Sequence, residues 1–138
     1  MSIAVKLSLV GMVCLALIAG CGKGDGFTRV KVRGEIQHKG EPVMDGQIRF
    51  YPESGTRSPV TIELVMGGKY ECKRKGGLPI GTHRVVILSF DPDSPVPKGP
   101  QDPPRPQWLP PKYNDHSELT MTVEKQRGWA TRDFDLKE

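Results

Sequence analysis

The chain has 138 residues, of which 36% are hydrophobic and 26% charged, and its formal net charge is +4 at pH 7. This length suits one compact domain with one core and is too short for two. The basic residues are spread along the chain, and the single run of three, residues 73–75, precedes a turn. Nucleic-acid-binding proteins usually carry a clustered basic stripe, so we expect no nucleic-acid partner.

The N-terminal segment has the layout of a signal peptide. Lys6 precedes an uncharged, apolar run over residues 7–19, and small residues follow at the end of that run. A basic start, a short apolar core and small residues at the exit are typical of secretory signals. The apolar run is shorter than the ~20 residues that a spanning helix needs. We therefore predict that residues 1–20 are removed after export.

The exit sequence is Ile18-Ala19-Gly20-Cys21, which resembles the lipobox of bacterial lipoproteins. The resemblance implies that the Cys21 thiol carries a diacylglyceryl group, that the chain is cleaved before it, and that the new amine is acylated. Two or three acyl chains hold a protein on a membrane without crossing it. Gly22 is not the aspartate that retains some lipoproteins at the inner membrane, which favours the outer membrane. The alternative is an ordinary secretory signal in which Cys14 and Cys21 are incidental.

Residues 21–27 follow as a glycine-rich tether, and residues 28–138 form the expected domain. A flexible tether of this length spans on the order of 10 to 15 Å on average. The domain would therefore stay close to the lipid headgroups.

Within the domain, apolar and polar residues alternate in seven short runs. Alternation with one apolar face predicts half-buried strands, and no segment has the helical period. The runs cover residues 28–37, 47–51, 60–66, 69–73, 82–90, 119–124 and 133–136. Seven short strands separated by turn residues predict an all-β, antiparallel sandwich.

Two of these strands have particular features. Residues 60–66 place Val60, Ile62, Leu64 and Met66 on the apolar face, and Gly67-Gly68 predicts a tight hairpin after them. If this strand lies at an edge, it could pair with another chain. Residues 82–90 are apolar on both faces, so we expect another segment to cover the outer one.

The candidate cover is a proline-rich loop over residues 91–112. Proline lacks a backbone donor and fixes φ, which excludes a helix or a central strand there. We expect residues 92–106 to be loosely ordered and Trp108 to fold over Val86 and Leu88. Trp108, Leu109 and Tyr113 together form a candidate binding surface for a peptide or glycan. The alternative is that Trp108 only seals the sheet.

Two further residues could carry chemistry. Cys72 is the one cysteine left after Cys14 and Cys21 are accounted for, and it shares a strand face with Tyr70. We interpret it as a buried small hydrophobe, because a reactive thiol needs an exposed, electropositive setting. His83 lies on an inward strand face and is interpreted as a hydrogen-bonded core residue.

Several phrases resemble the transthyretin-like, carboxypeptidase-regulatory-like β-sandwich. Residues 32–36 (VRGEI) and 40–43 (GEPV) are similar to that family's opening phrase, 68–71 (GKYE) to its "D-G-x-Y", and 78–85 (LPIGTHRV) to its "L-P-x-G-x-Y-x-V". The ending from residue 109 resembles short planctomycetal-type lipoproteins with this domain. The resemblance implies a folding or interaction module. His83 replaces the usual tyrosine.

Transthyretin-related hydroxyisourate hydrolases share this architecture, but they need paired histidines, an arginine and a closing "Y-R-G-S" tail. This chain ends FDLKE, and its three histidines fall on a turn, a strand and a loop. Common catalytic motifs are missing from the sequence, and no metal or cofactor is expected. We predict a noncatalytic, membrane-anchored binding module whose partner is an envelope protein or glycan. The alternatives are an accessory domain for an envelope enzyme and a small hydrolase.

Overall fold

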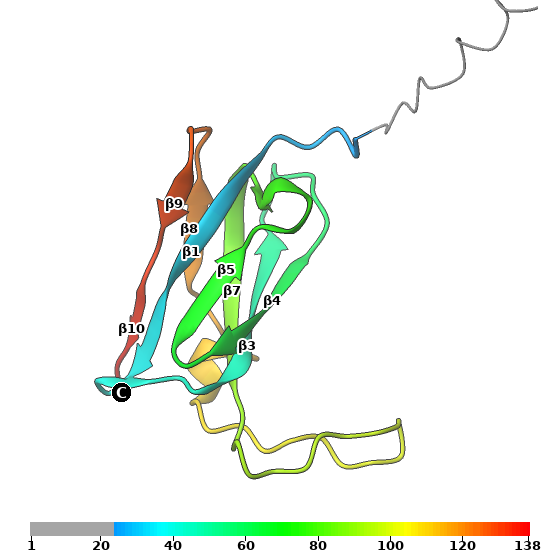
Figure 1. The fold of residues 1–138 in the computed structure, drawn as a ribbon, viewed down its shortest axis with the longest axis vertical. Helices are drawn as coiled ribbons and strands as arrows, with labels where there is room; N and C mark the ends of the chain where they lie inside the picture. Colours follow the sequence, from blue (N-terminus) through cyan, green and yellow to red (C-terminus); the bar gives the residue numbers. More distant parts are fainter. Residues whose placement is uncertain (1–23) are drawn as a thin grey trace, which may run out of the picture.

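The computed structural model describes residues 24–138 (Figure 1). The predicted signal peptide and Cys21 lie outside the described residues, and residues 24–27 are the described part of the tether. The described chain is all-β, as the alternating runs predicted. Its strands form one curled sheet wrapped around a single core.

Each of the seven predicted runs contains a strand, and three short strands occur in addition. In chain order the strands are β1 (Arg29–His38), β2 (Glu41–Pro42), β3 (Asp45–Pro52), β4 (Thr61–Met66), β5 (Lys69–Cys72), β6 (Leu78–Pro79), β7 (Gly81–Ser89), β8 (Thr120–Val123), β9 (Trp129–Thr131) and β10 (Phe134–Leu136). Two short 3-10 turns, η1 (Arg74–Gly76) and η2 (Pro111–Tyr113), complete the list. After β1 the chain turns at residues 39–40 and returns as β2.

The sheet runs in the order β10-β1-β5-β4-β3-β7-β8, with β2, β6 and β9 also paired to β1. Most neighbouring strands are antiparallel, but β9 and β10 run parallel to β1. The antiparallel arrangement predicted from the sequence therefore holds for most of the sheet but not at this edge. The reason is that the chain crosses from β8, which pairs with β7, to β9, which pairs with β1.

The core is lined by alternate residues of the strands and closed by three residues from outside them, Val43, Leu109 and Tyr113. From β1, Val32 and Ile36 are completely buried, and from β3, Ile48 and Phe50 are. The predicted inward pair of β5 is confirmed, because both Tyr70 and Cys72 are buried.

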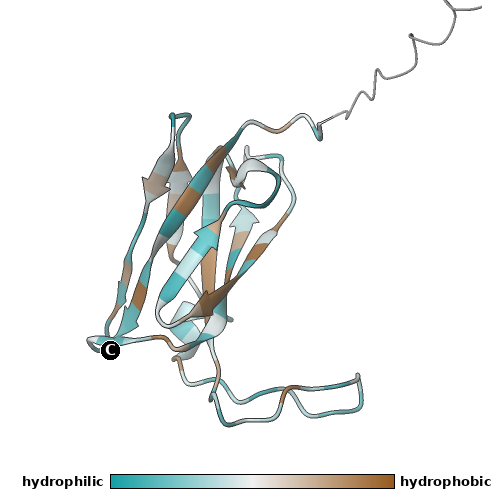
Figure 2. Ribbon diagram, in the orientation of Figure 1, coloured by the Kyte–Doolittle hydropathy of each residue, from teal (hydrophilic) through white to brown (hydrophobic). Residues whose placement is uncertain are grey.

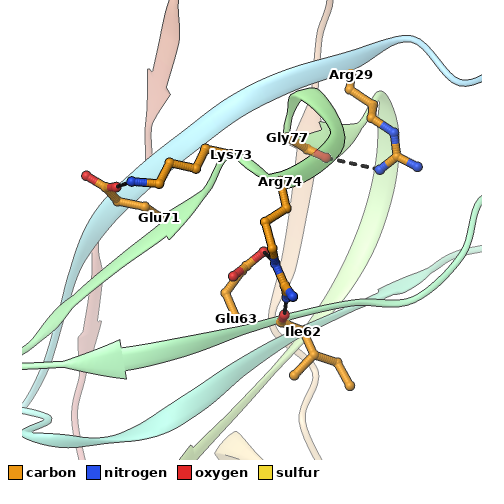
Figure 3. A network of polar contacts seen from close by, with 7 residues as sticks. All are labelled: Arg29, Ile62, Glu63, Glu71, Lys73, Arg74 and Gly77. Atoms are coloured by element: carbon orange, nitrogen blue, oxygen red, sulfur yellow. Dashed lines mark hydrogen bonds and ion pairs between the residues drawn. The ribbon is translucent and has the colours of Figure 1, made fainter. Parts of the chain in front are cut away.

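The hairpin between β4 and β5 turns at Gly67 and Gly68 as predicted, and both have positive φ (59° and 77°). Two left-handed residues form the turn that matches the twist of an antiparallel pair. The two strands pair only at Met66 and Lys69. Beyond that pair they diverge, and Arg74 lies between them, with its guanidinium donating to the Ile62 carbonyl oxygen at 2.8 Å (Figure 3).

Strand β4 turns its apolar face away from the core, contrary to the expectation from its alternation. Val65 is buried, whereas Ile62, Leu64 and Met66 are exposed. The cause is the register with β3, in which Gly46 lies opposite Val65 and Ile48 opposite Glu63. Residues directly opposite each other share a face, so the inward side of β3 fixes the inward side of β4.

A candidate binding cleft at Trp108

The proline-rich loop leaves the sheet after β7 and forms a long excursion at one end of the molecule (Figure 1). Arg105 closes the base of this loop. Its guanidinium donates to an Asp45 carboxylate oxygen and to the Asp91 carbonyl oxygen, both at 2.7 Å, and lies 4.8 Å from the centre of the Phe90 ring. The Arg105 side chain is largely buried, so these contacts tie both limbs of the loop to β3.

After Arg105 the chain returns alongside the end of β7. Gln107 forms a bridge with Phe90, and the Trp108 amide donates to the Ser89 carbonyl oxygen at 3.1 Å. Downstream, the Asn114 side-chain amide donates to the Leu109 carbonyl oxygen at 3.2 Å. The backbone on both sides of Trp108 is therefore held by hydrogen bonds to the rest of the domain.

The three predicted surface residues have different environments. Trp108 is 61% exposed, whereas Leu109 is 5% exposed and Tyr113 is also buried. The Tyr113 hydroxyl donates to the Lys137 carbonyl oxygen, which joins this segment to the C-terminus. Leu109 and Tyr113 thus anchor the segment in the core, and the indole of Trp108 remains at the surface.

The prediction that Trp108 covers Val86 and Leu88 is wrong. The Trp108 backbone amide donates a hydrogen bond to the carbonyl oxygen of Ser89, at the end of β7, and the Trp108 side chain remains exposed. The outer face of β7 lies beside long side chains of β3 instead, with Arg49 opposite Val86 and Gln47 opposite Leu88. The Arg49 guanidinium donates to the Gln47 side-chain oxygen at 2.8 Å, which holds both side chains over the sheet.

A cleft of about 410 Å³ lies beside Trp108, where the β1–β2 turn approaches the base of the loop. This volume falls within the range of ordinary small-ligand sites. Its lining combines apolar and aromatic side chains with a few polar groups. The lining residues are His38, Lys39, Glu41, Pro42, Val43, Met44, Ser89, Phe90, Pro92, Trp108 and Leu109.

The chemistry of this cleft suits contact with a ligand. Met44 is 57% exposed beside Trp108, so the cleft offers a thioether and an indole, both of which adapt to apolar surfaces. His38 contributes an Nε2 atom that is buried and has no hydrogen-bond partner among the described residues. Within residues 24–138, no three His, Cys, Asp or Glu side chains gather where they could hold a metal ion.

Sequence reasoning found Trp108 but missed Met44, His38 and the role of Arg105. Arg105 did leave a signal, because it is the one arginine of residues 91–112 and lies between Pro104 and Pro106. Met44 and His38 gave none. They reach the cleft because the Gly68 amide donates to the Val43 carbonyl oxygen and the Gly67 amide to that of Met44. These bonds join the β2–β3 connection to the β4–β5 turn, which depends on long-range pairing.

His83 and Cys72 are structural, as interpreted from the sequence. His83 is completely buried, and its Nε2 hydrogen-bonds the Pro79 carbonyl oxygen at 2.8 Å. Burial lowers the pKa of His83 against a smaller opposing effect of this bond. Burial also raises the pKa of the Cys72 thiol to about 12, with Glu63 adding to the shift. A protonated, inaccessible thiol is not nucleophilic.

Comparison with known proteins returned no matching family model, curated protein or solved structure. Across the described part of the chain, no helix has the length and apolar character needed to cross a membrane.

The lowered pKa of His83 predicts a pH-dependent stability. The unfolded chain binds a proton near pH 6.5, whereas the folded chain resists it, so stability should fall as the pH drops below that value, by up to about 1.4 kcal/mol per pH unit. Urea unfolding measured between pH 5 and pH 8 tests this. His83→Gln keeps a donor for Pro79 and should flatten the dependence below pH 6.5. The control, His116→Gln, changes an exposed histidine, and equal slopes in both variants would contradict the assignment.

The contrast between Leu109 and Trp108 predicts opposite effects on stability. Leu109→Ala should cost roughly 2 to 5 kcal/mol of unfolding free energy, because it leaves a cavity in the core. Trp108→Ala should change the unfolding free energy by less than about 1 kcal/mol, because the indole is mostly exposed. Denaturant unfolding measures both. A large loss in Trp108→Ala would show that the indole seals the sheet after all.

Proposed function

We propose that this chain is a lipid-anchored protein of the bacterial cell envelope whose domain is a noncatalytic binding module. The proposal combines a membrane anchor at Cys21 with a ligand site at the Trp108 cleft. The partner is an envelope protein or a glycan. We also propose that the curled sheet is a transthyretin-like sandwich, in which β4-β3-β7-β8 packs over β10-β1-β5.

The observation that carries the binding role is the exposure of Trp108 on a fixed backbone. An indole left in water is a cost unless a partner covers it, and tryptophan is enriched among the residues that dominate binding energies. Holding the backbone in place reduces the entropy that a partner must overcome when it binds. Arg105, Leu109 and Asn114 all act on this backbone, so the segment is built to present Trp108 and not to bury it.

The sequence of the N-terminal segment supports the anchor. Residues 7–19 form an uncharged, apolar run. The lipobox-like sequence Ile18-Ala19-Gly20-Cys21 follows at its end. The described tether residues are exposed, and β1 begins at Arg29, so only a short segment separates the anchor from the sheet. A partner bound by this module is held near the membrane on which the protein is anchored.

The anchor predicts an acylated protein that stays with membranes. The full-length chain, expressed with its own leader, should appear by intact mass as a product that begins at Cys21 and carries acyl groups. Cys21→Ser should remove the acyl mass and release the protein into the detergent-free fraction. A processed wild-type chain without acyl mass, recovered in a salt-washed supernatant, would contradict the anchor.

The binding role predicts that partners depend on Trp108. In pull-downs from solubilised envelope with the tagged full-length protein, Trp108→Ala should lose the partner that wild type retains, while its unfolding free energy stays close to wild type. Val96→Ala removes another exposed apolar side chain from the same loop and serves as the control. Retention of the same partners by Trp108→Ala would exclude the cleft as the binding site.

A further inference from the structure

The two outer faces of the curled sheet differ in character. On the β1–β5 face, exposed charges of opposite sign lie opposite each other, with Arg33 opposite Glu71 and Glu35 opposite Lys69. On the other face, β4 exposes Ile62, Leu64 and Met66, which are 43%, 62% and 69% exposed. The end of β4 is among the hydrophobic segments in Figure 2, whereas β5 beside it is largely hydrophilic. The β1–β5 face is therefore charged and suited to solvent, whereas the β4 face is apolar.

The exposed residues of β4 share their face with residues of β3 and β7. Leu64 lies opposite Gln47, which lies opposite Leu88, and Ile62 is connected in the same way through Arg49 to Val86. Residues opposite each other across a sheet share a face. We define this surface, made of the exposed Ile62, Leu64 and Met66 and the half-buried Leu88, as the apolar face; Val86 is 7% exposed and lies beneath it.

The charges on the apolar face are mainly positive. Arg49 and Arg84 share it, and neither forms an ion pair with an acid in the described part of the chain. Asp45, the acid on the same side of β3, is already paired with Arg105. Apolar side chains with unpaired arginines complement an anionic apolar surface. Two copies facing each other would bring these arginines together, which disfavours a dimer.

Asp25, in the described part of the tether, lies beside the start of this face. Asp25 pairs with Arg29, which fixes the tether at the start of β1. A hollow of about 340 Å³ lies between Asp25 and the beginning of β4, and Val60 and Ile62 line it. Cys21 is four residues before Asp25, and four extended residues span at most about 14 Å. Acyl chains on Cys21 would therefore hold a bilayer within reach of the apolar face.

We propose that the apolar face lies against the membrane and contacts anionic phospholipid. The proposal rests on the acylated Cys21 of the proposed function. Ile62, Leu64 and Met66 enter the headgroup region, and Arg49 and Arg84 meet lipid phosphates. The tether and the proline-rich loop lie at opposite ends of the sheet (Figure 1). Docking by this face lays the sheet along the membrane and keeps the Trp108 cleft at the end away from the anchor.

Fluorescent labels on the two faces test this orientation. Cys14 leaves with the leader, an acylated Cys21 is blocked and Cys72 is buried, so an introduced cysteine is the one reactive thiol. Leu64→Cys labels the apolar face, and Thr131→Cys labels an exposed position on the opposite face. Each full-length protein is labelled with an environment-sensitive dye and reconstituted into vesicles of phosphatidylethanolamine and phosphatidylglycerol that contain a nitroxide-bearing lipid.

We expect the label at position 64 to shift to shorter wavelength and to be quenched several-fold more strongly than the label at position 131. Arg49→Gln with Arg84→Gln should weaken quenching at position 64 in these vesicles but not in phosphatidylcholine vesicles. Equal, weak quenching at both positions would overturn the proposal. So would self-quenching between labels at position 64, which would show a contact between two copies.

Failure of the anchor and failure of docking give different results. Intact mass of each labelled protein reports acylation of Cys21 separately from quenching. If Cys21 carries no acyl group, the chain with Cys14→Ser, Cys21→Ser and Leu64→Cys is labelled and mixed with the same vesicles. Quenching at position 64 in that mixture supports docking without an anchor, and its absence overturns docking.

Discussion

The close approach of the C-terminal segment to β1 at Gly34 is the constraint on which the rest of the fold depends. A side chain at Gly34 would place its Cβ 1.8 Å from the Arg132 carbonyl oxygen, so only glycine allows this approach. The same oxygen accepts a hydrogen bond from the buried Tyr70 hydroxyl at 2.7 Å. Burial raises the pKa of Tyr70, which keeps this hydroxyl protonated as a donor. One carbonyl thus joins β1, β5 and the C-terminal strands.

This junction also explains which parts of the fold could be predicted from the sequence. The alternation of apolar and polar residues correctly predicted which residues of β1, β3, β5, β7, β8 and β10 face inward, because these residues pack in one shared core. It failed for β4, where it predicts that Val60, Ile62, Leu64 and Met66 face the core. The register with β3 instead turns these four side chains toward solvent. Short strands such as β9 have too few residues for a pattern, and they form because β1 offers a free edge.

The candidate site was predicted in its chemistry but not in its geometry. Prolines and Trp108 identified the segment, and the structure shows that Leu109, one residue later, has the buried role expected for Trp108. Adjacent side chains in an extended segment point to opposite sides, so burying Leu109 turns Trp108 outward. The sequence alone does not determine whether Trp108 or Leu109 is buried in the core. The choice depends on Asn114 and Tyr113, whose hydrogen bonds position the segment.

The exposed apolar side chains of β4 and of Trp108 serve two different contacts if the proposals hold. The face of β4 is broad, carries arginines and lies beside the tether, which fits a continuous lipid surface. Trp108 is a single large aromatic beside a bounded cleft at the other end of the sheet, which fits a discrete partner. The β3 register turns the face of β4 outward, and burial of Leu109 turns Trp108 outward. Under the two proposals, the anchored module touches a membrane with the first surface and a partner with the second.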